Sequence, residues 1–110
     1  MVVTLYCTAP SDAVARTLAE GLLAAKLAAC VNLLPGGRSL YVWDAQLQDE
    51  PETYLLIKTT EPQAAAATAW LVTNHPYDEP CVTGWRCEFG SQPFAAWVAS
   101  QATGPAGTTE

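Results

Sequence analysis

The sequence predicts an α+β fold of the ferredoxin-like split βαβ class, a two-layer sandwich with the element order βαββαβ and a short C-terminal helix. Two observations support this: β-rich and helical segments follow one another in this order, and the two central β-rich segments are long enough to form an extended hairpin. The chain has 110 residues, about one ordinary domain. We expect a single domain over residues 1–101 and a disordered tail over 102–110.

The first half of the fold begins with a β-rich run over Val2–Thr8, which Pro10 ends. Ser11 and Asp12 then offer side-chain oxygens that cap a helix. Apolar residues recur at spacings of three and four over Ala13–Leu27, and the charged residues lie off this stripe. The pattern predicts a helix that packs one face on the sheet.

A long central hairpin is predicted from strands over Cys30–Trp43 and Thr53–Thr60, joined by an acidic turn. The segment Pro35-Gly36-Gly37 interrupts the first strand, and we expect a bend or β-bulge there because proline removes a backbone donor. Both faces of these strands are apolar, whereas a domain of this size covers only one face of its sheet. The second face therefore predicts an oligomer.

The second half starts with a helix at Glu61-Pro62, because proline suits the first helical turn and the alanine-rich run after it favours helix to about Asn74. Two prolines make the segment 75–80 a rigid, non-helical connection. A last strand is predicted over Cys81–Phe89, followed by a turn and a closing helix over Phe94–Ser100. We expect both helices of the βαββαβ unit on one face of the sheet.

Acidic residues dominate the charge: eleven acids stand against five lysines and arginines, for a net charge of -6. This balance leaves no basic surface for a phosphate backbone and argues against a nucleic-acid partner. Asp49, Glu50 and Glu52 cluster beside the predicted turn. We interpret them as a solvated hairpin tip that discourages pairing with other strand edges.

The chain shows no signal-peptide pattern at its start and no apolar run of membrane-spanning length. We therefore expect a cytoplasmic protein with no membrane partner. A cytoplasmic location keeps cysteines reduced, and no tight zinc-type spacing is present. The four cysteines are expected to be thiols: Cys7, Cys30, Cys81 and Cys87.

Five short strings, in their order and spacing, resemble the CutA divalent-cation-tolerance family: Cys7-Thr8-Ala9-Pro10, Lys26-Leu27-Ala28-Ala29-Cys30-Val31-Asn32, Ser39-Leu40-Tyr41-Val42-Trp43, Leu56-Ile57-Lys58-Thr59-Thr60 and His75-Pro76-Tyr77. The resemblance extends over the chain to about Ser100. It implies a ferredoxin-like homotrimer whose long hairpins pair between subunits, with an architecture related to the PII signalling proteins. It also implies a cytoplasmic protein linked to tolerance of copper and other divalent metals.

The resemblance implies metal ligands at Cys7, His75 and Cys81, although many family members carry Glu where this chain has Cys81. Thiolates and imidazole suit copper, zinc or cadmium better than magnesium, and Glu79 or Asp78 is a further candidate oxygen ligand. The alternatives are structural: a strand cysteine is commonly a small buried apolar residue, and His75 is also placed to meet the helix dipole.

The leading functional hypothesis is a non-enzymatic homotrimer that binds copper or other divalent or soft metal ions and requires no cofactor. The alternative is a PII-like regulatory or scaffold trimer that binds a small anionic ligand or a partner protein at subunit clefts. An enzyme ranks last, because a single histidine does not supply a nucleophile, a base and an orienting group. No catalytic or cofactor-binding residue is therefore assigned.

Overall fold

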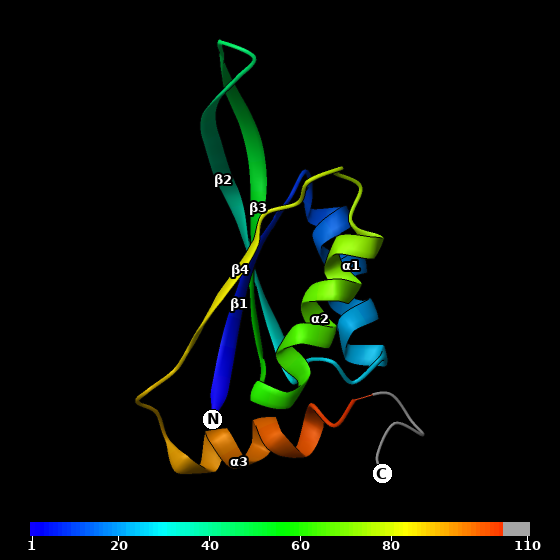
Figure 1. Ribbon diagram of the computed structural model, residues 1–110, viewed down its shortest axis with the longest axis vertical. Helices are drawn as coiled ribbons and strands as arrows, with labels where there is room; N and C mark the ends of the chain where they lie inside the picture. The colour runs from blue at the N-terminus through cyan, green and yellow to red at the C-terminus, as the bar shows by residue number, and fades with distance from the viewer. Residues whose placement is uncertain (105–110) are drawn as a thin grey trace.

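The structure, a computed structural model that describes residues 1–104, contains one four-stranded antiparallel sheet with the strand order β2-β3-β1-β4. The strands are β1 (Val2–Ala9), β2 (Cys30–Trp43), β3 (Gln46–Thr60) and β4 (Val82–Arg86). Helices α1 (Asp12–Ala24) and α2 (Glu61–Asn74) lie together on one face, and α3 (Gln92–Gln101) closes one end (Figure 1). The predicted ferredoxin-like βαββαβ order with an added helix is confirmed.

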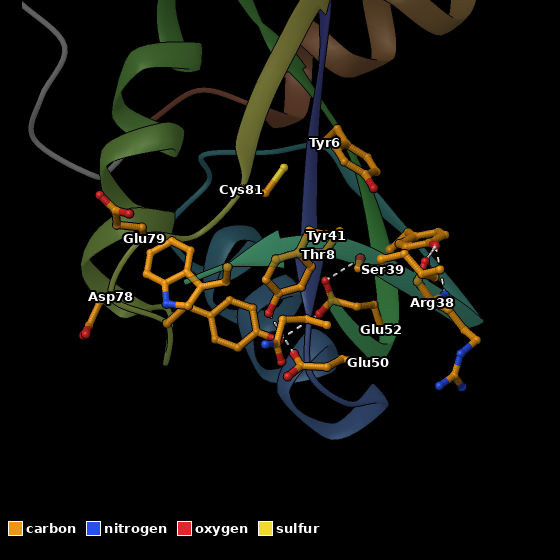
Figure 2. Close-up of a pocket in the computed structure, with 15 residues that line it drawn as sticks. Tyr6, Thr8, Arg38, Ser39, Tyr41, Glu50, Glu52, Asp78, Glu79 and Cys81 are labelled. Carbon is orange, nitrogen blue, oxygen red and sulfur yellow. Dashed lines mark hydrogen bonds between the residues drawn. The ribbon is translucent and has the colours of Figure 1, made fainter. Parts of the chain in front are cut away.

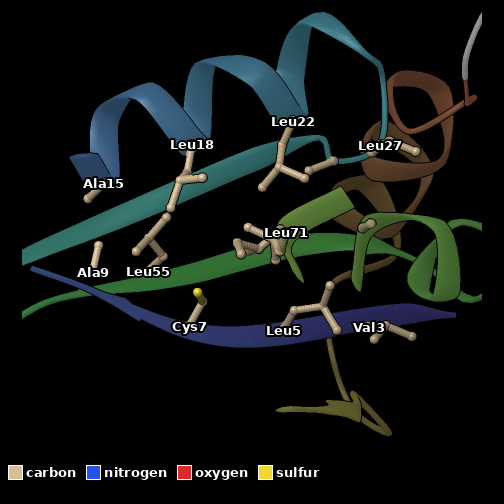
Figure 3. Packing of buried hydrophobic residues seen from close by; sticks show 13 residues of the cluster. Val3, Leu5, Cys7, Ala9, Ala15, Leu18, Leu22, Leu27, Leu55 and Leu71 are labelled. Carbon is tan, nitrogen blue, oxygen red and sulfur yellow. The ribbon is translucent and has the colours of Figure 1, made fainter. Parts of the chain in front are cut away.

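The hydrophobic core lies between the sheet and the two helices that cover it (Figure 3). Alternate residues of a strand point to the same face, so every second side chain of β1 and β3 enters this layer. The helices contribute residues spaced three or four apart. Two strands and two helices contribute to it: Val3, Leu5 and Cys7 come from β1, Leu18 and Leu22 from α1, Leu55 and Ile57 from β3, and Leu71 from α2.

Helix α1 begins as predicted and ends earlier than predicted. The Ser11 hydroxyl accepts a hydrogen bond of 3.2 Å from the backbone N–H of Val14 and so caps the first turn. At the other end, Lys26 adopts a left-handed backbone conformation with φ 58°, and Leu27 N–H donates to the carbonyl of Leu22. This pattern closes a helix in the way that a terminal glycine usually does. The predicted continuation to Leu27 is therefore wrong.

The hairpin turn consists of Asp44 and Ala45, both with positive φ, which suits the twist of a two-residue hairpin. The prediction of an acidic turn before Thr53 is wrong, because β3 already begins at Gln46. The acids interpreted as a solvated tip lie within this strand, and Glu52 is buried. The predicted β-bulge is confirmed, since the register between β2 and β3 shifts between Leu34 and Gly37.

The C-terminal part differs from prediction in its bounds. Strand β4 has only five residues, which pair with β1 from Cys7↔Val82 to Val3↔Arg86. The tail expected from residue 102 starts inside the fold: Ala102 is buried, and the N–H of Gly104 donates to the carbonyl of Lys26. Residues 105–110 lie outside the described residues, so their predicted disorder stays a prediction.

The face of the sheet opposite α1 and α2 carries no helix within residues 1–104 (Figure 1). The hairpin also extends past the helices, and four of its apolar side chains are between 63% and 70% exposed: Leu40, Val42, Trp43 and Leu47. Among the described residues, no helix is both long and apolar enough to cross a membrane. The hairpin end thus presents an exposed apolar surface.

Candidate functional site

The thiol of Cys7, the first predicted ligand, belongs to the core. Cys7 lies on the helix-covered face of β1, is fully buried, and has its Sγ 3.6 Å from the carbonyl oxygen of Thr8 (Figure 3). Burial, with smaller contributions from the charges of Cys81 and Glu52, raises the pKa of the Cys7 thiol to about 12. At neutral pH it is therefore a protonated thiol, whereas a metal ligand is the thiolate.

The imidazole of His75, the second predicted ligand, follows α2 directly and is only 8% exposed. Its Nδ1 accepts a hydrogen bond of 3.1 Å from the backbone N–H of Tyr77, so Nδ1 carries no proton in this arrangement. Its Nε2 lies 2.7 Å from the carbonyl oxygen of Thr8 and donates to it. Both ring nitrogens are thus engaged, and His75 ties the loop after α2 to the end of β1.

Cys81, the third predicted ligand, is exposed and lies just before β4. Cys7 pairs with Val82 across the sheet, so Cys81 is next to Cys7 in register but its side chain emerges on the opposite, open face. Within residues 1–104, no three His, Cys, Asp or Glu side chains converge to hold a metal ion. The described chain therefore does not bring Cys7, His75 and Cys81 together as one ligand set.

A groove of about 900 Å³ lies on the open face, at the base of the hairpin (Figure 2). Arg38 lies toward one end, and Asp78 and Glu79 lie toward the other. Four carboxylates line it, those of Glu50, Glu52, Asp78 and Glu79, together with the Cys81 thiol. Five aromatic side chains complete the walls: Tyr6, Tyr41, Trp43, Tyr54 and Tyr77. The groove combines negative charge with aromatic surface.

Glu52 is the most constrained acid of the groove, since it is only 8% exposed. One carboxylate oxygen accepts a hydrogen bond of 2.9 Å from the Ser39 hydroxyl, and the other accepts one of 2.7 Å from the phenol of Tyr77. Strand β2, strand β3 and the loop after α2 therefore meet at this carboxylate. These two hydrogen bonds hold the loop after α2 in place as one wall of the groove.

Three phenols of the groove, those of Tyr77, Tyr6 and Tyr41, hold their protons more tightly than free tyrosine. Burial raises the pKa of Tyr77, and the hydrogen bond to Glu52 and its charge raise it further. Burial also raises the pKa of Tyr6, with a contribution from Cys81. For Tyr41 the same direction follows from desolvation and from Glu50, whose carboxylate accepts a hydrogen bond of 3.3 Å. The phenols thus remain neutral hydrogen-bond donors near pH 7.

Sequence reasoning missed the central role of Glu52 because it placed the start of β3 too late. With the strand beginning at Gln46, alternation puts Glu52 on the same face as Tyr54 and Leu56. The period-two pattern therefore contained the signal. The hydroxyl that donates to Glu52 belongs to Tyr77, which lies in the loop that follows α2 in the sequence. No local sequence pattern connects Glu52 with Tyr77.

Comparisons with known proteins agree over nearly the whole chain. The family model described as "CutA1 divalent ion tolerance protein" matches residues 3–101. A divalent-cation tolerance protein CutA of Pectobacterium atrosepticum is 42% identical over 96 residues, which cover 87% of each chain.

Solved structures give the same result. The structure of CutA from Xylella fastidiosa superposes with a TM-score of 0.90 at 31% identity, covering 92% of this chain and 97% of that one. A CutA from Archaeoglobus fulgidus, described as periplasmic, has a TM-score of 0.89 at 31% identity over 93% of this chain and 99% of that one. Fold and sequence thus point to one family.

Proposed function

The chain belongs to the CutA1 divalent ion tolerance family, and from that membership we propose that it is a cytoplasmic homotrimer that binds copper or other divalent or soft metal ions as its cargo. The observation that carries the proposal is the groove on the open face of the sheet. There an exposed thiol and four carboxylates stand against a single guanidinium, that of Arg38. A cleft of one charge sign raises the local concentration of ions of the opposite sign.

Cys81 is the donor that best suits this role. Its thiol is exposed and needs no rearrangement to reach an ion, and thiolate ligands favour copper, zinc and cadmium over magnesium or calcium. Asp78 and Glu79 line the same groove and offer hard oxygen ligands. In this arrangement Cys7 and His75 are structural residues and not ligands. Cys7 packs in the core, and His75 holds the loop after α2 through its hydrogen bonds with Thr8 and Tyr77.

The donor set of the described chain is incomplete, because no three suitable groups converge within residues 1–104. A site shared between copies resolves this, since the groove opens on the sheet face that α1 and α2 leave uncovered. The exposed apolar side chains of the hairpin end also support self-association, because large exposed apolar patches mark interaction surfaces. We propose that acids of a neighbouring copy complete the donor set around Cys81.

The alternative of a PII-like trimer that binds a small anion fits the charge of the groove poorly. Arg38 is its only lysine or arginine, and the Nε of Arg38 already donates to Asp49 at 2.8 Å. Lys58 lies on the open face but donates to the amide oxygen of Asn32. A scaffold role for a partner protein is compatible with the exposed hairpin, and no observation favours it over metal binding.

Native mass spectrometry of reduced, untagged protein tests the proposal, with copper, zinc and cadmium offered together. We expect a trimer that carries metal, loses it in Cys81→Ser and retains it in the control Cys87→Ser, whose thiol lies outside the groove beside Thr4. His75→Ala should weaken binding less than Cys81→Ser does. A metal-free trimer in the parent protein would refute metal binding, and a metal-loaded Cys81→Ser trimer would refute the assigned donor.

A further inference from the structure

The carboxylate of Glu52 is buried without a positive partner in the described chain. Its two oxygens accept hydrogen bonds from the neutral hydroxyls of Ser39 and Tyr77. The ion pairs among residues 1–104 are Arg16–Glu20, Arg38–Asp49 and Arg86–Glu61, and none of them includes Glu52. Buried charges in proteins are normally paired, because an unpaired one is costly to remove from water. No cation of the described chain therefore balances the charge of Glu52.

Aromatic rings surround the approach to this carboxylate. The ring of Tyr77 carries the hydroxyl that donates to Glu52, and Tyr41 lines the same groove with its hydroxyl bonded to Glu50. Tyr6 and Tyr54 form a tilted pair with ring centroids 6.0 Å apart, and both line the groove. Faces of aromatic rings attract cations, and such rings arranged around a cation bind methylated ammonium groups in particular.

The size of the groove and the spacing of its acids favour an organic cation over a bare metal ion. A space of about 900 Å³ is in the range that holds a small organic molecule. Each oxygen of Glu52 accepts one hydroxyl hydrogen bond and keeps a lone pair for a further partner, but within residues 1–104 no three metal-ligating side chains converge to hold a bare ion. A cation without N–H donors needs only the charge of Glu52 and the faces of the rings.

We propose that this groove binds a small quaternary ammonium ion, with the charged group near Glu52 and its methyl groups against the rings of Tyr41 and Tyr77. This inference does not rest on the proposed metal cargo, since Cys81 takes no part in it. The phenols keep their protons near neutral pH and so add no negative charge that would depend on conditions. The remaining carboxylates, Glu50, Asp78 and Glu79, attract the cation over longer distances.

Isothermal titration calorimetry of the assembled protein, in EDTA to remove metals, tests the proposal with choline as the probe. Its control ligand is 3,3-dimethyl-1-butanol, which has the same shape without the charge. We expect choline to bind and the neutral alcohol to bind at least tenfold more weakly. Absence of choline binding at millimolar concentration, or equal binding of the two ligands, would overturn the proposal, and neither result depends on a variant that folds.

Variants locate the site. Glu52→Gln keeps the shape of the side chain and removes its charge, so we expect at least tenfold weaker choline binding. Glu20→Gln, at an exposed acid on α1, is the matched control and should bind as the parent does. Cys81→Ser should also retain choline binding, which separates this site from the metal cargo. Unchanged binding in a folded Glu52→Gln protein, checked by circular dichroism, would refute the placement of the charged group.

Discussion

The phenol of Tyr77 donates a hydrogen bond of 2.7 Å to Oε2 of Glu52, across 25 residues of sequence. It joins the loop after α2 to the base of the long hairpin, on the face of the sheet that the helices leave open. The ring of Tyr77 also packs on His75, with centroids 4.7 Å apart, and His75 in turn donates to the carbonyl of Thr8. Three segments are thus linked at one edge of the groove.

Removing the Tyr77 hydroxyl is expected to destabilise the protein. Tyr77→Phe keeps the ring and leaves one oxygen of Glu52 without its donor, and hydrogen bonds to charged groups contribute about 1.5–3 kcal/mol. Because Tyr77 is only partly buried, we expect a loss of about 1–2 kcal/mol in the free energy of unfolding. Urea unfolding at equal protein concentrations measures it. The control is Tyr41→Phe, whose longer, exposed hydrogen bond to Glu50 should contribute little.

Gly21→Ala is expected to destabilise the protein, although alanine forms helix better than glycine by about 1 kcal/mol. A Cβ at Gly21 would lie 2.4 Å from two ring carbons of Trp70, which packs from α2. The resulting overpacking costs about 1–3 kcal/mol and outweighs the gain in helix propensity. Thermal unfolding measures the sign. If the clash is the cause, Trp70→Leu should cost less in the Gly21→Ala background than in the parent protein.

Stability should fall between about pH 9 and pH 12, in part because of Cys7. The pKa of this thiol is about 12 in the fold, against 9.0 for an unperturbed thiol, so above pH 9 the unfolded chain loses the proton first. The contribution of Cys7 is complete below pH 9 and is lost as the pH rises to 12. Tyr77 and Tyr6 act in the same direction, because their pKa values are also raised.

Comparison of the parent with Cys7→Ala isolates the share of Cys7 in this alkaline loss. The slope of unfolding free energy against pH should be shallower in the variant between pH 9 and 12, and an unchanged slope would contradict the assignment. Alkylation with iodoacetamide at pH 8, followed by mass spectrometry, gives an independent check. Exposed Cys81 should react first among the four cysteines and buried Cys7 last.

A negative charge on the open face should prevent assembly. Leu56 lies on this face, opposite Tyr6 on β1 and Asn32 on β2, away from the core of the monomer. Leu56→Asp is therefore expected to give a folded monomer, because the buried face of an assembly does not accept an unpaired charge. Light scattering after size exclusion measures the mass. An intact oligomer would show that this face is not the contact surface.

Truncation distinguishes the role of the residues that follow α3. A chain that ends after Gly104 keeps buried Ala102 and the hydrogen bond from Gly104 to Lys26, and it is the reference. Ending it after Gln101 removes buried Ala102 and the hydrogen bond from Gly104 to Lys26, at an expected cost of about 1–2 kcal/mol. Denaturant unfolding of both truncated chains provides the comparison. Equal stability of the two would show that this docked segment contributes nothing.

Much of the fold was predictable because its signals are local. The apolar spacing of α1, the proline at the start of α2 and the bulge at Pro35-Gly36-Gly37 each depend on neighbouring residues alone. The ends of the helices and strands were less predictable, because they depend on contacts that the local pattern does not contain. Helix α1 ends at a left-handed Lys26, a conformation that sequence does not announce in a lysine, and β4 pairs with β1 over only five residues.

The sequence by itself determined the order of the elements, the faces that α1 and the sheet bury, and the family to which the chain belongs. Only the tertiary structure decided what the candidate site contains. In the folded chain Cys7 lies in the core, and both ring nitrogens of His75 form hydrogen bonds. Cys81 is exposed, and Glu52 is buried and bonded to Tyr77. The reason is physical: strand and helix periodicity are local properties, whereas the burial of a charge depends on segments that meet only after folding.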